Sequence, residues 1–214
     1  MTIEEYYRKR SGEYDKIYET AEWQEDLRLL ATWLAGLTRD RSVLEVAAGT
    51  GYWTQIAAAG ATRITATDHS PAMLARAAKR RLGRKVTLRR ADAYALPAMT
   101  SSFDVGMAHL WWSHVETQRQ QQFLTQLACR LKPGATLLMI DQLHIAGYSA
   151  PALRRDRFGN RYELRSLDNG DIHQIVKNYP DAQQLEQRFG CVCDAIKVRR
   201  LRYFWSLQAR LRRR

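Results

Sequence analysis

Residues 43–54 read VLEVAAGTGYWT, and this segment constrains the fold of the chain more than any other. A short run of branched apolar residues ends in a loop of small residues, and the loop opens a helical pattern. Gly49 and Gly51 carry no Cβ, so backbone N–H groups of the loop can approach a ligand closely. Glu45 stands just before the loop, where a carboxylate can hold either the loop or a ligand's amino group. The segment therefore predicts a strand, a ligand-binding loop and a helix in succession.

Acidic residues close the next two apolar runs. Asp68 ends the run that begins at Ile64, and a carboxylate in that place can accept hydrogen bonds from two ribose hydroxyls. Asp92, followed by the small Ala93, comes directly after the third run. In open α/β sheets ligands bind beyond the C-terminal ends of the strands, so these carboxylates are expected near the small-residue loop.

In this order and spacing, the three elements resemble the class I S-adenosylmethionine-dependent methyltransferases. Ala47 stands where that family's E-x-G-x-G-x-G pattern usually has its first glycine, and alanine is nearly as small. A nicotinamide-dependent dehydrogenase is the competing interpretation, but its G-x-G-x-x-G pattern needs a third glycine where this chain has Thr54. The resemblance implies S-adenosylmethionine as the cofactor, with Gly49 and Gly51 beneath its methionine moiety and Asp68 on its ribose.

Several further side chains are candidates for contact with this cofactor. Met73 could pack on the adenine or belong equally to the core. Aromatic faces attract a sulfonium ion, and Tyr7, Tyr14 and Trp53 are candidates for that contact, with a purely structural role as the open alternative. The expected cofactor-binding residues are Tyr7, Tyr14, Glu45, Ala47, Gly49, Gly51, Trp53, Asp68, His69, Met73, Asp92, Ala93 and His109.

Apolar runs alternate with helical patterns from residue 43 onward, and this predicts a mostly parallel sheet with right-handed crossovers. The expected fold is an α/β, Rossmann-like class I methyltransferase sandwich with seven strands and a C-terminal antiparallel hairpin. We expect one domain over 1–214, in which 1–36 form a helical lid and 142–178 a small β insertion over the acceptor pocket. Strands are expected at 42–47, 63–67, 86–90, 103–108, 135–141, 191–199 and 201–208, and helices over 23–36, 71–82, 123–131 and 180–189.

The composition is strongly basic, with 34 Lys and Arg against 22 Asp and Glu and a formal net charge of +12. Such charge can attract RNA or anionic substrates, although a merely solvated surface is the simpler interpretation. The charged N-terminus carries no signal region and no apolar stretch is long enough to span a bilayer, so we expect a cytoplasmic protein without a membrane partner. Three cysteines give no disulfide framework, and no spacing of His and Cys predicts a metal site.

Candidates for the acceptor site follow the fourth strand and lie in the insertion. His109 and His114 come after the strand that begins at 103, and Arg165 and Lys177 flank the Asp-Asn-Gly turn at 168–170. The patterns YYRKRSGEYD at 6–15 and RSLDNGDIHQIVK at 165–177 resemble a small branch of bacterial natural-product O-methyltransferases of the phosphonate O-methyltransferase kind. That resemblance implies that Arg165 and Lys177 clamp an anionic acceptor and that His114 faces it.

The sequence therefore predicts an S-adenosylmethionine-dependent methyltransferase acting on a small molecule, at an oxygen of an anionic acid. The alternatives are an RNA or protein methyltransferase that uses the basic surface, and a cofactor-binding subunit that supports a partner enzyme. A base methyltransferase of the N/D-P-P-Y/F type is disfavoured, because Ala108-His-Leu-Trp111 stands in place of that motif. The oligomeric state does not follow from the sequence.

Overall fold

A seven-stranded sheet with the order β3-β2-β1-β4-β5-β10-β9 forms the centre of the molecule. The computed structural model describes residues 3–99 and 102–213. Strands β1 to β5 pair in parallel, whereas β10 runs antiparallel to both β5 and β9. The strand bounds are β1 Ser42–Val46, β2 Arg63–Asp68, β3 Val86–Arg90, β4 Phe103–His109, β5 Leu131–Gln142, β9 Cys193–Arg200 and β10 Phe204–Leu211.

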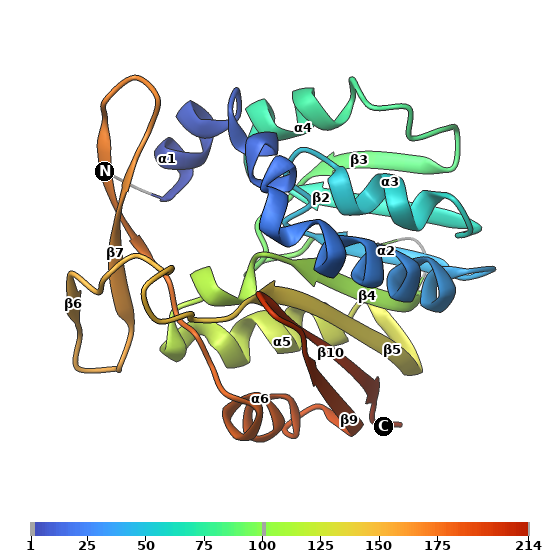
Figure 1. Ribbon diagram of the computed structural model, residues 1–214. Helices are drawn as coiled ribbons and strands as arrows, with labels where there is room; N and C mark the ends of the chain where they lie inside the picture. The colour runs from blue at the N-terminus through green and yellow to red at the C-terminus, as the bar shows by residue number, and fades with distance from the viewer. Residues whose placement is uncertain (1–2, 100–101, 214) are drawn as a thin grey trace.

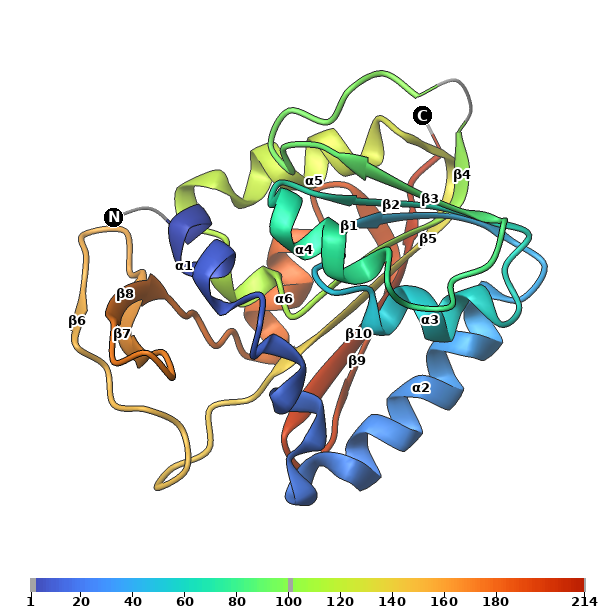
Figure 2. The same cartoon turned by 90° about the horizontal axis from the view of Figure 1, so that it is seen from above.

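Helices cover both faces of this sheet (Figures 1 and 2). One face carries α2 Gln24–Thr38, α3 Tyr52–Ala58 and α4 Pro71–Ala77, and the other carries α5 Gln120–Ala128 and α6 Ala182–Phe189. The central strands are mostly apolar because successive side chains enter different cores. Leu137 and Met139 belong to the core beneath α5, whereas Leu138 and Ile140 belong to the core beneath α2. This confirms the predicted Rossmann-like sandwich with its C-terminal antiparallel pair.

Two further parts lie beside one end of the sheet (Figure 1). The N-terminal segment consists of α1 Ile3–Arg10 and the short 3-10 helices η1 Tyr14–Glu19 and η2 Ala21–Trp23. The accessory sheet consists of β6 Arg154–Arg155, β7 Arg161–Ser166 and β8 Ile172–Val176, with a hairpin turn at 168–170 as the sequence predicts. Short 3-10 helices η3 Trp112–His114 and η4 Thr117–Arg119 follow β4.

Polar contacts join the N-terminal segment to the accessory sheet and to the small-residue loop. Lys9 pairs with Asp171 of the accessory sheet at 2.7 Å between Nζ and Oδ2. Asp15 accepts a hydrogen bond from the hydroxyl of Thr50 and pairs with Arg80 at 2.6 Å. The segment therefore bridges the small-residue loop and the accessory sheet.

Several predicted element bounds are wrong. The helix expected over 71–82 ends at Ala77, because Lys79 and Arg80 donate to the carbonyls three residues before them and tighten the chain into turns. The helix expected to reach Leu131 ends at Ala128, and α2 continues past residue 36 to Thr38. Strand β5 begins at Leu131 rather than at 135, because Leu131 already pairs with Phe103 and a shift in register absorbs the Pro-Gly step.

Candidate active site

The loop between β1 and α3 holds its small residues in the left-handed backbone region. Ala47 has φ 56°, Gly49 φ 57° and Gly51, the residue that precedes α3, φ 79°. The N–H of Gly49 donates to Oδ2 of Asp68 at 2.8 Å, which ties the loop to the end of β2. The glycines at 49 and 51 therefore meet a backbone requirement, whereas Ala47 adopts the same conformation at a steric cost.

The nearly equal φ angles at positions 47 and 49 predict opposite effects on stability. Ala47→Gly should raise the free energy of unfolding by about 0.5–1 kcal/mol, because glycine relieves the left-handed strain. Gly49→Ala should lower it by about 1–2 kcal/mol for the same reason. Urea denaturation of both variants without added ligand measures these changes. A loss of stability in both variants would contradict the strain at Ala47.

A cavity opens in front of this loop, at the C-terminal ends of the parallel strands. Gly49 leaves room here, since a Cβ at that position would meet no heavy atom within 4 Å. Most of the residues expected to bind a cofactor lie around this first cavity, which is lined by Tyr7, Tyr14, Ala47, Gly49, Asp68, His69, Ser70, Met73, Ala91, Ala93, His109, Leu110 and Trp111.

Asp68 presents its carboxylate at the edge of the first cavity. Oδ1 accepts the N–H of Ser70 and Oδ2 that of Gly49, each at 2.8 Å. Burial raises the pKa of Asp68, and these two N–H groups act in the opposite direction. Because each carboxylate oxygen has two lone pairs, the group retains capacity to accept hydroxyl donors from a ligand.

Four of the expected cofactor residues do not line the first cavity. Gly51 precedes α3, and a Cβ at this position would lie 3.1 Å from the Cβ of Ala77. Trp53 is buried behind the loop, with its ring centroid 5.3 Å from that of His109. Asp92 accepts the N–H of Tyr94 at 2.8 Å. Glu45 is the fourth residue that does not line the cavity.

Glu45 lies beneath the loop, where 1% of its surface is exposed. The hydroxyl of Thr54 donates to Oε2 of Glu45 at 2.5 Å. Burial raises the pKa of Glu45 from 4.5 to about 8, with a further increase from the charge of Asp68 and a decrease from the Thr54 bond. The carboxyl group is therefore mostly protonated at pH 7.

His109 is a buried polar side chain of the first cavity. Burial lowers its pKa from 6.5 to about 3, so the imidazole is neutral near pH 7. Neither ring nitrogen makes a hydrogen bond within the described part of the chain. An unsatisfied polar group in a buried position is costly, so both nitrogens are available for a bound ligand.

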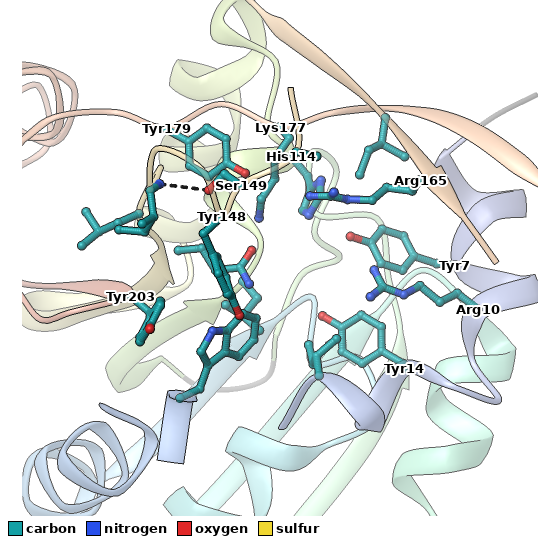
Figure 3. Close-up of a pocket in the computed structure, with 18 residues that line it drawn as sticks. Tyr7, Arg10, Tyr14, His114, Tyr148, Ser149, Arg165, Lys177, Tyr179 and Tyr203 are labelled. Carbon is teal, nitrogen blue, oxygen red and sulfur yellow. Dashed lines mark hydrogen bonds between the residues drawn. The ribbon is translucent and has the colours of Figure 1, made fainter. Parts of the chain in front are cut away.

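A second cavity, of about 350 Å³, adjoins the first, since Tyr7, Tyr14 and Leu110 line both. It lies between the N-terminal segment, the accessory sheet and the chain that follows β5. The side chains of Arg10 and Arg165 point into it from one side, and those of His114 and Lys177 line the same space (Figure 3). The predicted acceptor residues His114, Arg165 and Lys177 therefore surround a single cavity.

The carboxylates beside this cavity are already engaged. Glu163 is fully buried, and both Arg165 and Arg161 pair with it, at 2.6 and 3.1 Å. Lys177 is buried and donates to the hydroxyl of Ser113 at 2.8 Å, with Oδ1 of Asp141 3.4 Å away. Burial lowers the pKa of Lys177, and the charge of Asp141 acts against that decrease.

Arg10 adds a further cation, which the sequence analysis missed. Its guanidinium donates to the Tyr6 hydroxyl at 2.6 Å and lies 5.1 Å from the ring centre of Tyr14. No carboxylate pairs with Arg10 among the residues that the structure describes. The cations around the cavity thus outnumber the carboxylates, which suits an anionic ligand.

The geometry of His114 fixes its tautomer. Nδ1 lies 2.7 Å from the carbonyl oxygen of Val176, and since a carbonyl can only accept, Nδ1 carries the proton. Burial lowers the pKa of His114 well below 6.5, and the charges of Lys177, Arg10 and Arg165 lower it further. The ring is therefore neutral near pH 7, with Nε2 as a hydrogen-bond acceptor.

The sequence contained a signal for Arg10 but not for the buried carboxylates. Arg10 stands one helical turn after Tyr7 within the YYRKRSGEYD pattern, so the two side chains share one face of α1.

Within the described residues, no group of three or more His, Cys, Asp or Glu side chains is placed to hold a metal ion. The described part of the chain also contains no helix long and apolar enough to cross a membrane.

Comparisons with known proteins agree with this geometry. The family described as a methyltransferase domain matches residues 43–134. A solved structure described as the DhpI–SAH complex is 26% identical, with a TM-score of 0.77, and the match covers 98% of this chain and 95% of that one. The structure described as the DhpI–SAM–HEP complex has the same identity and TM-score, over 96% and 94% of the two chains. No curated protein sequence matches significantly.

The fold alone does not determine the reaction. The cyclase SpnF is 15% identical with a TM-score of 0.72, over 99% of this chain and 96% of that one, and this likeness shows the fold only. The domain match is more specific, because residues 43–134 include the small-residue loop and Asp68, and the two DhpI structures are described as complexes with SAH and with SAM. Residues 43–134 thus match a methyltransferase domain, and together with the structures described with SAH and SAM this match supports an S-adenosylmethionine-dependent methyltransferase with S-adenosylmethionine as its cofactor.

Proposed function

We propose that this methyltransferase transfers the methyl group to an oxygen of a small-molecule acid. The observation that carries the proposal is the cluster of Arg10, Arg165 and Lys177 around a cavity that adjoins the cofactor cavity. The related structure described as DhpI–SAM–HEP contains a further named component beside SAM, which supports a site for two ligands. An acid held by these cations has an ionised oxygen at pH 7 and therefore needs no strong base.

The residues of the first cavity suit the cofactor. We assign Gly49 and Ala47 to the close backbone approach, Asp68 to hydrogen bonds with the ribose, and Met73 to an apolar contact. The unsatisfied nitrogens of His109 offer a hydrogen bond to a polar group of the cofactor. Tyr7 and Tyr14, whose pKa values are raised by burial, remain neutral phenols and present aromatic faces between the two cavities.

The contribution of the chain to catalysis is alignment and exclusion of water. Bound S-adenosylmethionine supplies a methyl group on a positively charged sulfur. Arg165 and Lys177 hold the acid so that one oxygen faces this methyl. They orient the acid without neutralising the oxygen that is methylated. Neutral His114 accepts a hydrogen bond through Nε2 and so orients an acceptor hydroxyl or a partly protonated acid.

The N-terminal residues 1–36 serve in this proposal as a lid, and residues 142–178 as an insertion over the acceptor, within one domain over 1–214. The bridge from Asp15 to Thr50 and from Lys9 to Asp171 supports this division, because it ties the lid to the small-residue loop and to the accessory sheet. Closure of such a lid keeps water from the reacting oxygen and strengthens the ionic contacts inside.

Replacement of Asp68 tests the cofactor assignment. Asp68→Ala should weaken the binding of S-adenosylhomocysteine by about 10–150-fold, or about 1.5–3 kcal/mol, because charge-assisted hydrogen bonds are lost. Isothermal titration calorimetry measures the change. Asp194→Ala, at an exposed carboxylate that pairs with Arg210 on the C-terminal hairpin, is the control and should leave the affinity unaltered. Equal affinities for the wild type and Asp68→Ala would remove Asp68 from the site.

An acid and its neutral analogue of the same shape test the acceptor assignment. With S-adenosylmethionine, we expect phenylacetate to yield a methyl ester and phenylacetamide to yield none, because only the acid satisfies the cations. Mass spectrometry detects the products. Methylation of RNA or of protein lysines in place of the acid would instead favour use of the basic surface. That outcome is disfavoured by the position of Arg210, which pairs with Thr136 near the start of β5, at the end of the sheet opposite the C-terminal ends of the parallel strands.

A further inference from the structure

The second cavity has two walls of different chemistry (Figure 3). Arg10 and Arg165 extend from one side, and Tyr148 and Tyr203 lie on the opposite side. Trp23 also lines the cavity, and its ring packs edge-on against Phe204 with centroids 5.0 Å apart. The cations suit an anionic group, and the aromatic side chains present the cavity with an apolar surface that such a group does not use.

Three separate parts of the chain build the aromatic wall. Trp23 ends the N-terminal segment, Tyr148 follows β5, and Tyr203 precedes β10. The rings of Tyr148 and Tyr203 lie 5.3 Å apart. Trp23 and Tyr203 are each 8% exposed, whereas Tyr148 is 47% exposed. The wall is thus fixed at its base and open to solvent at Tyr148.

Resting on the proposed function, we propose that the acceptor is an acid with an aromatic or similarly bulky apolar body. The anionic group lies against Arg10, Arg165 and Lys177, and the body lies against Trp23, Tyr148 and Tyr203. This arrangement places the oxygen that is methylated next to Tyr7 and Tyr14, the residues shared with the cofactor cavity.

The size of the cavity supports this class of acceptor. A volume of about 350 Å³ lies within the range of pockets that enclose drug-sized ligands. An acid of two or three carbons would leave space for several water molecules, each of about 30 Å³, against aromatic side chains that gain nothing from hydrating them. An aromatic body would displace that water and form ring contacts with Tyr148 and Tyr203.

A cationic acceptor is the other class that aromatic walls attract. The charges of the cavity oppose it. Glu163 and Asp141 are held by Arg161, Arg165 and Lys177, and Arg10 has no carboxylate partner within the described residues. Burial lowers the pKa of His114, and the positive charges of Lys177, Arg10 and Arg165 lower it further, so an amine would enter the cavity against the same positive field.

Two acids that share a head group test the inference. Ethylphosphonate and benzylphosphonate are compared by kcat/KM with S-adenosylmethionine, and by calorimetry with enzyme saturated with S-adenosylhomocysteine. We expect benzylphosphonate to be preferred by about 10–100-fold, because its ring buries apolar surface against the aromatic wall. Tyr148→Ala should reduce this preference to about threefold or less. Leu164→Ser is the matched control, since Leu164 is equally exposed, at 47%, but lies on β7 outside the cavity and should leave the preference intact.

The outcomes separate this inference from the proposed function. Equal kcat/KM values for the two phosphonates, together with a loss of both in Arg165→Met, would overturn the aromatic subsite and leave the anionic acceptor standing. Failure to bind or methylate any of the three acids, the two phosphonates and phenylacetate, would overturn the proposed function itself. An unchanged preference in Tyr148→Ala, Tyr203→Ala and Trp23→Leu would also overturn the subsite.

Discussion

Replacing Arg165 with methionine should lower kcat/KM for the acid by about 10–1000-fold, or about 1.4–4 kcal/mol of transition-state stabilisation. The guanidinium lines the acceptor cavity, and its removal takes away a charge-assisted contact with the ionised oxygen. Affinity for S-adenosylhomocysteine should change by less than about threefold, because Arg165 does not line the first cavity. Steady-state kinetics and calorimetry measure the two quantities separately.

Arg165 is a better probe of the anion site than Lys177. When Arg165 is removed, Glu163 keeps its ion pair with Arg161, so no buried carboxylate is left alone. When Lys177 is removed, the fully buried Asp141 loses its cation, which costs on the order of 3–5 kcal/mol of stability. A Lys177→Met variant would therefore lose activity partly through unfolding, and its Tm must be measured first.

A conservative variant serves as the control for Arg165. Arg165→Lys keeps the charge but loses the two-pronged geometry, and should recover part of the activity. An acceptor whose kcat/KM is the same for the wild type and Arg165→Met would place its anionic group elsewhere. In that case Arg10, the cation without a carboxylate partner among the described residues, is the next residue to replace.

The fold was predictable because its signals are local. Branched apolar runs alternate with helical patterns, and the central runs are buried on both faces, so the parallel sheet follows from the pattern alone. The bounds of α4 and β5 were less predictable. They depend on side chains such as Arg80, which reaches the Thr50 carbonyl at 2.7 Å, and on the pairing of Leu131 with Phe103. Neither contact is visible in a periodicity.

The candidate site was predictable in part for the same reason. The small-residue loop and Asp68 are 19 positions apart and joined by one strand–loop–helix unit, so the motif identifies them together. The acceptor cavity unites residues more than 150 positions apart, from Arg10 to Arg165. Their meeting depends on how α1 packs on the accessory sheet, through contacts such as Tyr6 against His173 at 5.4 Å. Helical spacing within α1 shows which side chains share a face but not what that face contacts.

The contribution of Glu45 to the stability of the protein should fall as the pH rises from about 4.5 to about 8. Its pKa is raised to about 8 in the folded protein from an ordinary value of 4.5. Between these two values the folded protein keeps a proton on Glu45 that the unfolded chain has released. The stabilising effect of that proton is complete at low pH and is lost progressively until the pH passes about 8. At 1.36 kcal/mol per pKa unit, the full loss approaches about 5 kcal/mol.

Glu45→Gln isolates this effect, because glutamine keeps an oxygen for the Thr54 hydroxyl and cannot ionise. Other groups also titrate in this range, so the quantity to compare is the difference in unfolding free energy between the wild type and Glu45→Gln at each pH. That difference should grow in favour of the variant from pH 5 to pH 8 and then level off. A difference in unfolding free energy that stays constant from pH 5 to pH 8 would show that Glu45 is ionised in the folded protein.

The charge of Asp68 provides a second test of the same group, because it contributes to the raised pKa of Glu45. Removal of that charge in Asp68→Asn should shift the levelling of the profile to lower pH, since ionisation of Glu45 then meets less repulsion. The pH dependence of stability that Glu45 still gives the Asp68→Asn variant should disappear when Glu45→Gln is added to it. If Glu45 stays neutral at pH 7, only one of the two carboxyl groups beside the loop carries a charge. Asp68 would then bear the full anionic character that a ribose-binding carboxylate requires.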